Sequence, residues 1–166
     1  APDYASLLQG HGISHLQDRA GSIDLDARCV TTASGRALQY SQLVIATGAQ
    51  PEDFGIQGVR DNALNFHTLS DLQPLQERVQ ELRRRPSSTS SLVIAGAGAT
   101  GVELACKLVD MLNGAAKVQL VELGDQILPR SKAFNREQAE KALKKRGVTV
   151  HLNTRVESVT APSVML

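Results

Sequence analysis

The sequence predicts an α/β fold built around a parallel sheet, and two observations carry this prediction. Apolar runs with the length of single buried strands, at residues 92–96, 117–122 and 148–152, alternate with two helical patterns. A cluster of glycines stands directly between the first of these strands and the helix that follows it. Because parallel strands need crossover connections, which are usually helices, this order is typical of a three-layer, doubly wound domain.

The glycine cluster has the spacing G-x-G-x-x-G and consists of Gly96, Gly98 and Gly101. Between a strand and a helix, this spacing is typical of a Rossmann-like dinucleotide-binding turn. Gly96 would permit the tight turn, Gly98 would let a pyrophosphate approach the backbone, and Gly101 would let the helix pack close to the strand. The N–H groups at the start of the helix, near Ala99, would hold the phosphates. An incidental glycine turn is the alternative.

A carboxylate stands at the end of the second predicted strand. Glu122 follows Gly101 by 21 residues, the place where an acid is expected to bind the 2′-hydroxyl of an adenosine ribose. Because a carboxylate would repel a 2′-phosphate, Glu122 favours NAD(H) over NADP(H). Arg130 is near enough in the sequence to leave NADP(H) as an alternative.

The first part of the chain has a different pattern, made of short alternating segments. Residues 3–11 predict a short helix, and residues 13–16 predict the edge of a strand. Residues 22–26 and 28–32 alternate weakly around a turn and predict an antiparallel hairpin, followed by another strand at residues 37–40. This pattern indicates a second domain.

An apolar run at residues 43–46 leads into Thr47 and Gly48. Its composition predicts a buried parallel strand. The small residues at its carboxyl end are placed where open α/β sheets bind ligands. Residues 51–66 are irregular and look like a crossing between two domains, and a helix with an apolar stripe is expected from about Ser70.

Composition excludes several classes of function. The 166 residues carry a net charge of +1 with few aromatic residues, which argues against a nucleic-acid partner. No apolar run approaches the roughly 18 residues of a membrane span, and no signal-peptide pattern is visible. Cys29 and Cys106 form no C-x-x-C pair, and His11 and His15 lack the company of a metal site. The sequence therefore predicts a cytoplasmic, reducing location with no metal.

Five segments carry a resemblance to a known group of proteins: residues 35–40 (GRALQY), 43–48 (LVIATG), 96–103 (GAGATGVE), 121–129 (VELGDQILP) and 143–150 (LKKRGVTV). They resemble the two-dinucleotide flavoprotein reductases of the pyridine nucleotide-disulphide oxidoreductase superfamily, in which an NAD domain is inserted into an FAD domain. Within this group, residues 54–59 (FGIQGV) look like type II NADH dehydrogenases, which are NADH:quinone oxidoreductases that pump no protons. The chain departs from the pattern at Ser41, where an aspartate often follows the tyrosine.

The resemblance implies roles for individual residues. Thr47 and Gly48 would approach FAD, and Glu122 would bind the adenosine ribose of NADH. Glu103 would lie near the contact between nicotinamide and flavin, as the candidate catalytic residue. The alternative for Glu103 is an acid in the first helical turn that interacts favourably with the helix dipole. The residues implied to hold the NADH phosphates are Gly96, Gly98, Ala99, Thr100 and Gly101.

The resemblance also implies an organisation and an activity. Residues 1–55 would be part of an FAD-binding domain, and residues 56–166 an NAD(H)-binding domain that is incomplete at its C-terminus. The chain is thus expected to be a fragment from the middle of a longer enzyme, inactive by itself. The parent would transfer a hydride from NADH to FAD and then reduce a quinone.

Other partners and activities are left open. Membrane contact would come only through C-terminal segments outside this sequence, so the parent would be cytoplasmic or peripheral on the membrane. A homodimer is a further expectation. The alternatives are a reductase with a protein acceptor of ferredoxin or rubredoxin type, and a non-catalytic redox sensor that binds NADH.

Overall fold

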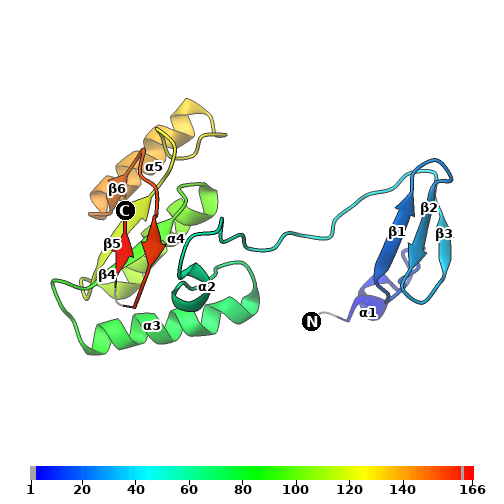
Figure 1. Cartoon of the computed structure of the whole chain (residues 1–166), viewed down its shortest axis with the longest axis horizontal. Coiled ribbons are helices and arrows are strands. Elements are labelled where there is room, and N and C mark those ends of the chain that lie inside the picture. Colours follow the sequence, from blue (N-terminus) through cyan, green and yellow to red (C-terminus); the bar gives the residue numbers. More distant parts are fainter. Residues whose placement is uncertain (1–2, 162) are drawn as a thin grey trace. The chain divides into compact units, whose positions relative to one another are not determined.

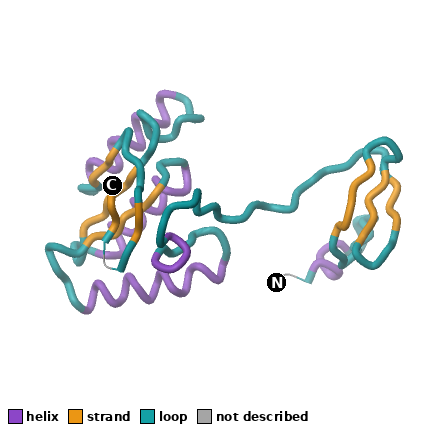
Figure 2. The backbone as a smooth tube through the Cα atoms, in the orientation of Figure 1, coloured by secondary structure: helices purple, strands orange, loops and turns teal. Residues whose placement is uncertain are grey.

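The chain divides into two units of structure, with the boundary between Gly48 and Ala49. The computed structural model describes residues 3–161 and 163–166, and Figure 1 and Figure 2 show the helices and strands of each unit. The predicted boundary between an FAD part and an NAD(H) part, after residue 55, stays a prediction.

Three antiparallel strands form the sheet of the first unit. They are β1 (Ala20–Asp24), β2 (Cys29–Thr32) and β3 (Ala37–Gln39), in the order β1-β2-β3. The short helix α1 (Tyr4–Leu8) precedes them, and the side chain of its N-cap residue Asp3 accepts a hydrogen bond from a backbone N–H of the first turn. The predicted hairpin, third strand and short helix are therefore present.

Two other predicted strands are wrong. Residues 13–16 and residues 43–46 belong to no strand. The side chains of Val44 and Ile45 are 85% and 66% exposed, whereas a buried strand was predicted for them. A parallel strand requires neighbours that bond its N–H and C=O groups, and the described residues place no strand beside this segment.

Asp18 links the segment before β1 to the turn between β2 and β3. Its carboxylate accepts a hydrogen bond from Ser34 Oγ, which lies 3.1 Å from the hydroxyl oxygen of the buried Thr32. Hydrogen bonds from the side chains of Ser34 and Thr32, and from the backbone of Arg19, lower the pKa of Asp18 from 3.8 to about 2. The ionised carboxylate therefore stabilises the folded first unit.

Asp18→Asn should make the first unit less sensitive to acid. Because the folded-state pKa lies below the unfolded value, the carboxylate stabilises the fold above pH 3.8, and this stabilisation is lost as the pH falls toward about 2. The group is exposed, so the effect is small.

Thermal unfolding of Asp18→Asn and of the wild type, from neutral pH to about pH 2, would measure this difference in acid sensitivity. The matched control is Asp26→Asn, because the Asp26 carboxylate makes no hydrogen bond among the described residues. Equal acid sensitivity of both variants would contradict the assignment.

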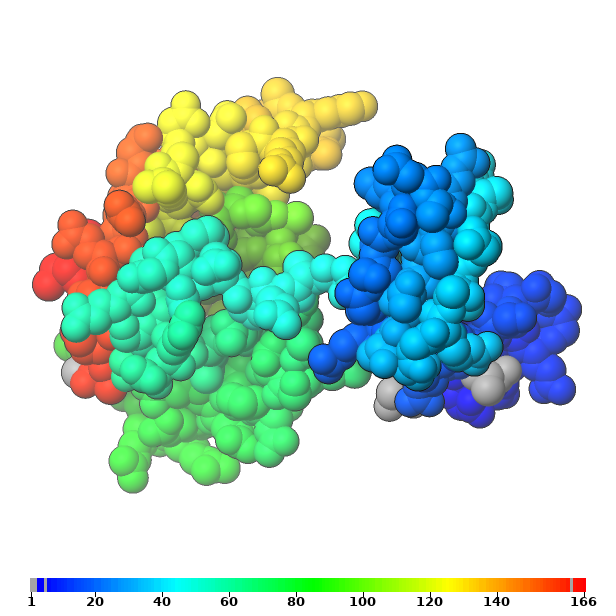
Figure 3. Space-filling model, turned by 45° about the vertical axis from the view of Figure 1, so that its right-hand side comes forward, coloured from blue at the N-terminus to red at the C-terminus, as the bar shows by residue number. Residues whose placement is uncertain are grey.

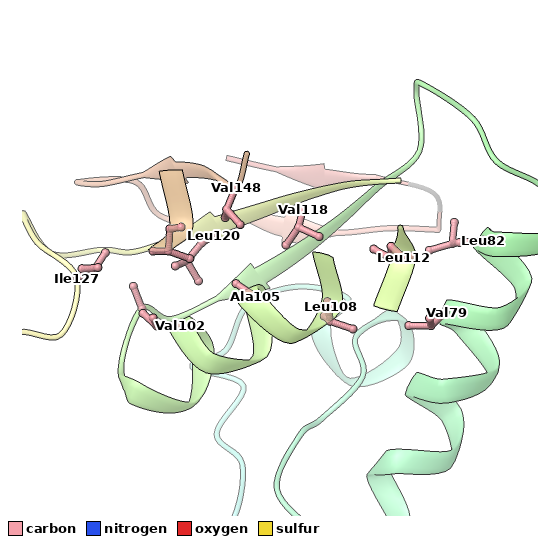
Figure 4. Packing of buried hydrophobic residues seen from close by; sticks show 12 residues of the cluster. Val79, Leu82, Val102, Ala105, Leu108, Leu112, Val118, Leu120, Ile127 and Val148 are labelled. Atoms are coloured by element: carbon pink, nitrogen blue, oxygen red, sulfur yellow. The ribbon is translucent and has the colours of Figure 1, made fainter. Parts of the chain in front are cut away.

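Three parallel strands form the sheet of the second unit: β4 (Ser91–Ala95), β5 (Lys117–Val121) and β6 (Thr149–His151), in the order β4-β5-β6. Helices α4 (Ala99–Leu112) and α5 (Ala133–Lys145) connect them. The alternation of strands and helices that the sequence predicts is therefore confirmed. Figure 4 shows α4 on one side of this sheet and the two short strands near the C-terminus of the chain, which are not part of the sheet, on the other.

The hydrophobic core lies between this sheet and the helices. Ala105 of α4 lies on the side that faces Val118 and Leu120 of β5 (Figure 4), and Ala105 and Leu120 are completely buried. Leu108 belongs to the same cluster. Leu143 of α5 is 1% exposed and belongs to the same cluster. Burying one large aliphatic side chain contributes about 1.5–3 kcal/mol, so this cluster is what holds α4 against the sheet.

Helix α3 (Leu72–Arg84) extends the core through Val79 and Leu82. It continues from the 3-10 helix η1 (Leu69–Asp71). The Asp71 carboxylate accepts hydrogen bonds from the N–H groups of Thr68 at 2.6 Å and of the residue before it at 2.9 Å. These bonds lower the pKa of Asp71 and begin the helix where the sequence predicts it.

The linker after the first unit runs beside the C-terminal hairpin. The hairpin consists of β7 (Ser158–Val159) and β8 (Val164–Met165), and the linker contains the short helix α2 (Val59–Asn62). Figure 3 shows the teal linker next to the red hairpin, and contacts between α2 and β7 agree with this view. Two segments from opposite ends of the second unit are thus neighbours.

Gly58 makes the closest approach between linker and hairpin. Its φ is +79°, and a Cβ on Gly58 would lie 1.9 Å from the Val159 carbonyl oxygen. The side-chain amide of Asn62 donates to the same oxygen at 3.2 Å, and the Val159 N–H donates to the Gln57 carbonyl at 2.9 Å. This contact therefore requires glycine at position 58.

No helix in the described residues has both the length and the apolar character that crossing a lipid bilayer requires. Across residues 3–161 and 163–166, no group of three or more His, Cys, Asp and Glu side chains is arranged to hold a metal ion. Cys29 and Cys106 are free thiols.

Candidate functional site

The glycine turn, residues 96–98, lies at the carboxyl edge of the parallel sheet. The last residues of the three strands, Ala95, Val121 and His151, stand in register beside one another. The chain leaves β4 at Gly96, whose φ is +100° and whose N–H donates to the Val121 carbonyl at 2.8 Å. A positive φ of this size favours glycine, so the turn depends on Gly96 and is fastened to the neighbouring strand.

Gly101 and Gly98 have opposite surroundings. A Cβ on Gly101 would lie 1.9 Å from the Gly96 carbonyl oxygen, so the close packing of α4 on the turn requires glycine. A Cβ on Gly98 would meet no atom within 4 Å, and the φ of Gly98 is an ordinary −69°. Nothing inside the protein therefore requires the absence of a side chain at Gly98.

The N-terminus of α4 opens beside Gly98. Gly98 is the N-cap residue and offers no side-chain cap, so the N–H groups of Ala99, Thr100 and Gly101 have no partner from within the helix. No acidic residue stands in the first turn. No side chain of the first turn thus compensates the positive end of the helix dipole.

Glu103 is the fifth residue of α4 and is exposed. It therefore lies in the second turn, and its interpretation as a first-turn acid is wrong. The helix begins at Ala99, as predicted, and its first turn of about 3.6 residues ends before Glu103.

Glu122 lies where all three strands end. Its N–H donates to the His151 carbonyl at 2.8 Å, and its carbonyl accepts from the Thr154 N–H at 3.0 Å. Its half-buried carboxylate accepts two more hydrogen bonds, from the Ala97 N–H to Oε2 at 2.7 Å and from the Gly124 N–H to Oε1 at 2.8 Å. The structure therefore brings Glu122 together with the glycine turn, as the sequence predicts.

The loop after Glu122 supports the glycine turn through contacts that the sequence did not predict. The Leu128 N–H donates to the Ala97 carbonyl at 2.8 Å. Ile127 is 2% exposed and anchors the loop in the core, and the Arg136 guanidinium of α5 donates to its carbonyl at 3.2 Å. No local pattern announces these contacts, since each partner is ordinary in its own stretch of sequence.

Thr47 and Gly48 end the first unit in exposed chain, with Gly48 at a φ of +75°. Their contact with FAD stays a prediction. Arg130 is exposed and makes no side-chain hydrogen bond among the described residues. Arg130 is thus a surface side chain.

A hollow of about 290 Å³ lies elsewhere in the second unit, at the ends of α3 and α4 that are remote from the glycine turn. Its walls include Arg83, Pro86 and Asn113. Asn113 is the C-cap of α4, with a φ of +47°. These residues lie at or just after the ends of α3 and α4. The residues that line the hollow include no group of side chains suited to catalysis.

The edge around the glycine turn offers binding groups rather than reacting groups. Free N–H groups at a helix N-terminus suit a phosphate, and an ionised carboxylate suits hydroxyl donors. Residues 96–103 contain no histidine or cysteine.

Known proteins show the same combination of elements. The model of the family described as pyridine nucleotide-disulphide oxidoreductase matches residues 5–165. The chain is 34% identical over 170 residues to demethylphylloquinone reductase NdbB of Synechocystis sp., a match that covers 100% of the chain and 42% of the relative. It is 30% identical over 179 residues to the alternative NAD(P)H-ubiquinone oxidoreductase C1 of Arabidopsis thaliana, covering 98% and 34%.

A solved structure adds the fold. The ferredoxin reductase for the CYP199A2 system of Rhodopseudomonas palustris has a TM-score of 0.70 and 25% identity, over 96% of this chain and 37% of that one. The chain spans less than half the length of each of these three proteins. Because the family match runs from the first helix to the C-terminal hairpin, the chain belongs to the pyridine nucleotide-disulphide oxidoreductase family.

Proposed function

We propose that the chain is part of an FAD-dependent NADH dehydrogenase, that its glycine turn and Glu122 bind NADH, and that the electrons pass to a quinone. The observation that carries the proposal is the open space at Gly98. A Cβ there would touch nothing within 4 Å, so the glycine has a purpose only if something outside the chain comes close to this backbone.

A pyrophosphate fits that space. It would lie against the N-terminus of α4, where the N–H groups of Ala99, Thr100 and Gly101 are unpaired within the helix and the helix dipole is positive. Gly96 and Gly98 would keep side chains out of its way. These five residues form the proposed phosphate site.

The adenosine ribose would lie on the Glu122 side of the turn. An ionised carboxylate accepts hydrogen bonds from the 2′- and 3′-hydroxyls of NADH, whereas it repels the 2′-phosphate of NADPH. The exposed Arg130 is the cation near in sequence that would favour NADPH, but within the described part of the chain no hydrogen bond holds its side chain toward Glu122.

A titration of the chain with NADH and with NADPH, followed by nicotinamide fluorescence, tests this site. We expect saturable binding with a lower Kd for NADH. A folded chain that binds neither nucleotide would overturn the assignment. A lower Kd for NADPH would reverse the role of Glu122.

Glu122→Arg should raise the Kd for NADH about tenfold or more, because a hydrogen bond to a charged group contributes about 1.5–3 kcal/mol and each 1.4 kcal/mol is tenfold. The ratio of the Kd for NADPH to that for NADH should fall, since the repulsive charge is gone. Glu140→Arg is the matched control, because Glu140 is exposed on α5 and makes no hydrogen bond among the described residues. Unchanged Kd values for both nucleotides would sink the ribose assignment.

The redox part of the proposal rests on the family. FAD, when bound, supplies the two-electron chemistry between NADH and the acceptor. Thr47 and Gly48 are the proposed FAD contacts in the first unit, although the described residues form no cradle around them. Glu103, exposed in the second turn of α4, is the proposed residue at the contact between nicotinamide and flavin.

The names of the two curated relatives favour a quinone as the acceptor, since both are quinone reductases. The similarity to a ferredoxin reductase keeps a protein acceptor as the second candidate. Activity of the full-length protein with a soluble quinone and with ferredoxin would decide between them. Flavin in the purified full-length protein would exclude the sensor, which would bind NADH without it.

Membrane contact and assembly are also proposals. A quinone that dissolves in lipid would be reached by a protein that sits peripherally on the membrane and otherwise faces the cytoplasm. The contact would use segments beyond the described residues. Flotation of the full-length protein with vesicles tests membrane contact, and sedimentation equilibrium tests the expected homodimer.

A further inference from the structure

We propose that Glu122 is also a positioning residue, which holds the glycine turn in its binding shape before NADH arrives. The pair of hydrogen bonds that the Glu122 carboxylate accepts from the Ala97 and Gly124 N–H groups is called the Glu122 bridge. The bridge belongs to the ligand-free chain, whereas its effect on NADH rests on the proposed function.

The bridge joins two segments that are distant in sequence. Ala97 lies in the glycine turn, 25 residues from Glu122, and Gly124 lies two residues after it. The N···O distances are 2.7 Å and 2.8 Å, as expected for hydrogen bonds strengthened by a charged acceptor. One carboxylate thus fastens the turn after β4 to the loop after β5.

Ala97 is the point at which the turn is held. It is completely buried, so both its N–H and its carbonyl need partners from the protein. The N–H donates to Glu122, and the carbonyl accepts from the Leu128 N–H at 2.8 Å. Both partners come from the segment that follows β5, and removal of the carboxylate would leave a buried N–H unpaired.

The bridge and ribose binding are compatible in the same carboxylate. An ionised carboxylate offers about four acceptor positions, and the bridge uses two of them. The remaining positions suit the two ribose hydroxyls. A turn already fixed in shape loses less freedom when the ligand binds, which favours affinity. Glu122 would therefore contribute to NADH binding twice, through contact and through the shape of the turn.

The bridge also constrains cofactor specificity. An arginine side chain has only donors, so Glu122→Arg would place N–H groups opposite the N–H groups of Ala97 and Gly124. The variant should therefore bind NADPH weakly, even though its preference has shifted. A second substitution that supplies an acceptor for Ala97 would be needed for tight NADPH binding.

Two variants of Glu122 separate the effect of the side chain's charge from the effect of its length. Glu122→Gln keeps the length of the side chain but has one oxygen and an NH₂ group, so it cannot accept from both amides. Glu122→Asp keeps the charge but is shorter by one methylene and does not span both partners. Glu140→Gln, on the exposed face of α5, is the matched control.

Hydrogen exchange of individual amides, followed by NMR without nucleotide, is the measurement. In Glu122→Gln and in Glu122→Asp, at least one of the Ala97 and Gly124 amides should exchange at least about tenfold faster than in the wild type. The proton resonance of the amide that loses its acceptor should move upfield. The Leu120 amide, in the central strand, should keep its rate, which distinguishes a local change from general unfolding. Glu140→Gln should change none of these values.

Two results would contradict the proposed role of the Glu122 bridge. One is that the Ala97 and Gly124 amides of Glu122→Gln exchange at their wild-type rates. The other is wild-type behaviour of Glu122→Asp together with loss in Glu122→Gln, which would mean that charge alone matters. Loss of protection in both variants, in a wild-type chain that binds no NADH, would support the bridge and contradict the proposed function instead.

Discussion

Gly98→Val is expected to abolish NADH binding in a chain that remains folded. The added side chain would meet no protein atom close to its Cβ, and valine readily adopts the φ of −69° found there. It would instead fill the space proposed for the pyrophosphate. We expect the Kd for NADH to rise about 100-fold or more, a loss of roughly 3 kcal/mol of binding free energy.

Isothermal titration with NADH would measure the loss of binding by Gly98→Val. Thermal unfolding without NADH would show whether the variant remains folded. Replacement of the N-cap glycine should change the free energy of unfolding by no more than about 1–2 kcal/mol. Gly114→Val is the control for a glycine outside the site, although its φ of +83° makes some loss of stability inevitable. NADH binding retained by folded Gly98→Val would show that the turn is used differently.

Gly101→Ala should destabilise the second unit, although the substitution adds only one methyl group. Its Cβ would lie 1.9 Å from the Gly96 carbonyl oxygen and 3.6 Å from a methyl group of Leu120. The first obstacle is backbone and cannot turn aside, so α4 must move away from the end of β4. We expect a loss at or above the upper end of the about 1–3 kcal/mol that overpacking costs, together with weaker NADH binding.

Urea unfolding of Gly101→Ala beside Gly98→Ala gives a matched comparison. Both variants gain the same methyl group in the same motif, three residues apart, but only the first meets protein atoms. Gly98→Ala should therefore be much closer to the wild type in its free energy of unfolding. Equal stability of the two variants would mean that α4 does not pack on the turn as described.

Local patterns were sufficient for the parallel sheet of the second unit and the helix after its first strand. The strands at residues 91–95 and 117–121 and the helix between them follow from short apolar runs and from glycine spacing. Glu122 was placed correctly at the turn, because strand ends in a parallel sheet meet at one edge. These features depend on residues that are close in sequence or on a rule of the fold.

Features that depend on distant partners were missed or wrong. Residues 43–46 have the composition of a buried strand, but composition does not say whether neighbouring strands exist, and these residues are exposed. The hydrogen bond from Ala97 to Glu122 and the clash that reserves position 58 for glycine each join segments far apart in the chain. The start of α4 near Ala99 was predicted correctly, and Glu103 was assigned to the wrong turn because one turn of about 3.6 residues from Ala99 ends before it.

The contact between the linker and the C-terminal hairpin sets an order of assembly. Asn62 and Val159 are 97 residues apart, and a loop of that length is closed at an entropic cost that local contacts do not offset. At the usual rate of translation, Asn62 would be added to the growing chain roughly 5–20 s before Val159. The strands and helices between them have time to form and then bring the two ends together. The linker should consequently dock last during synthesis and open first in the mature chain, while the sheet that carries the glycine turn stays closed.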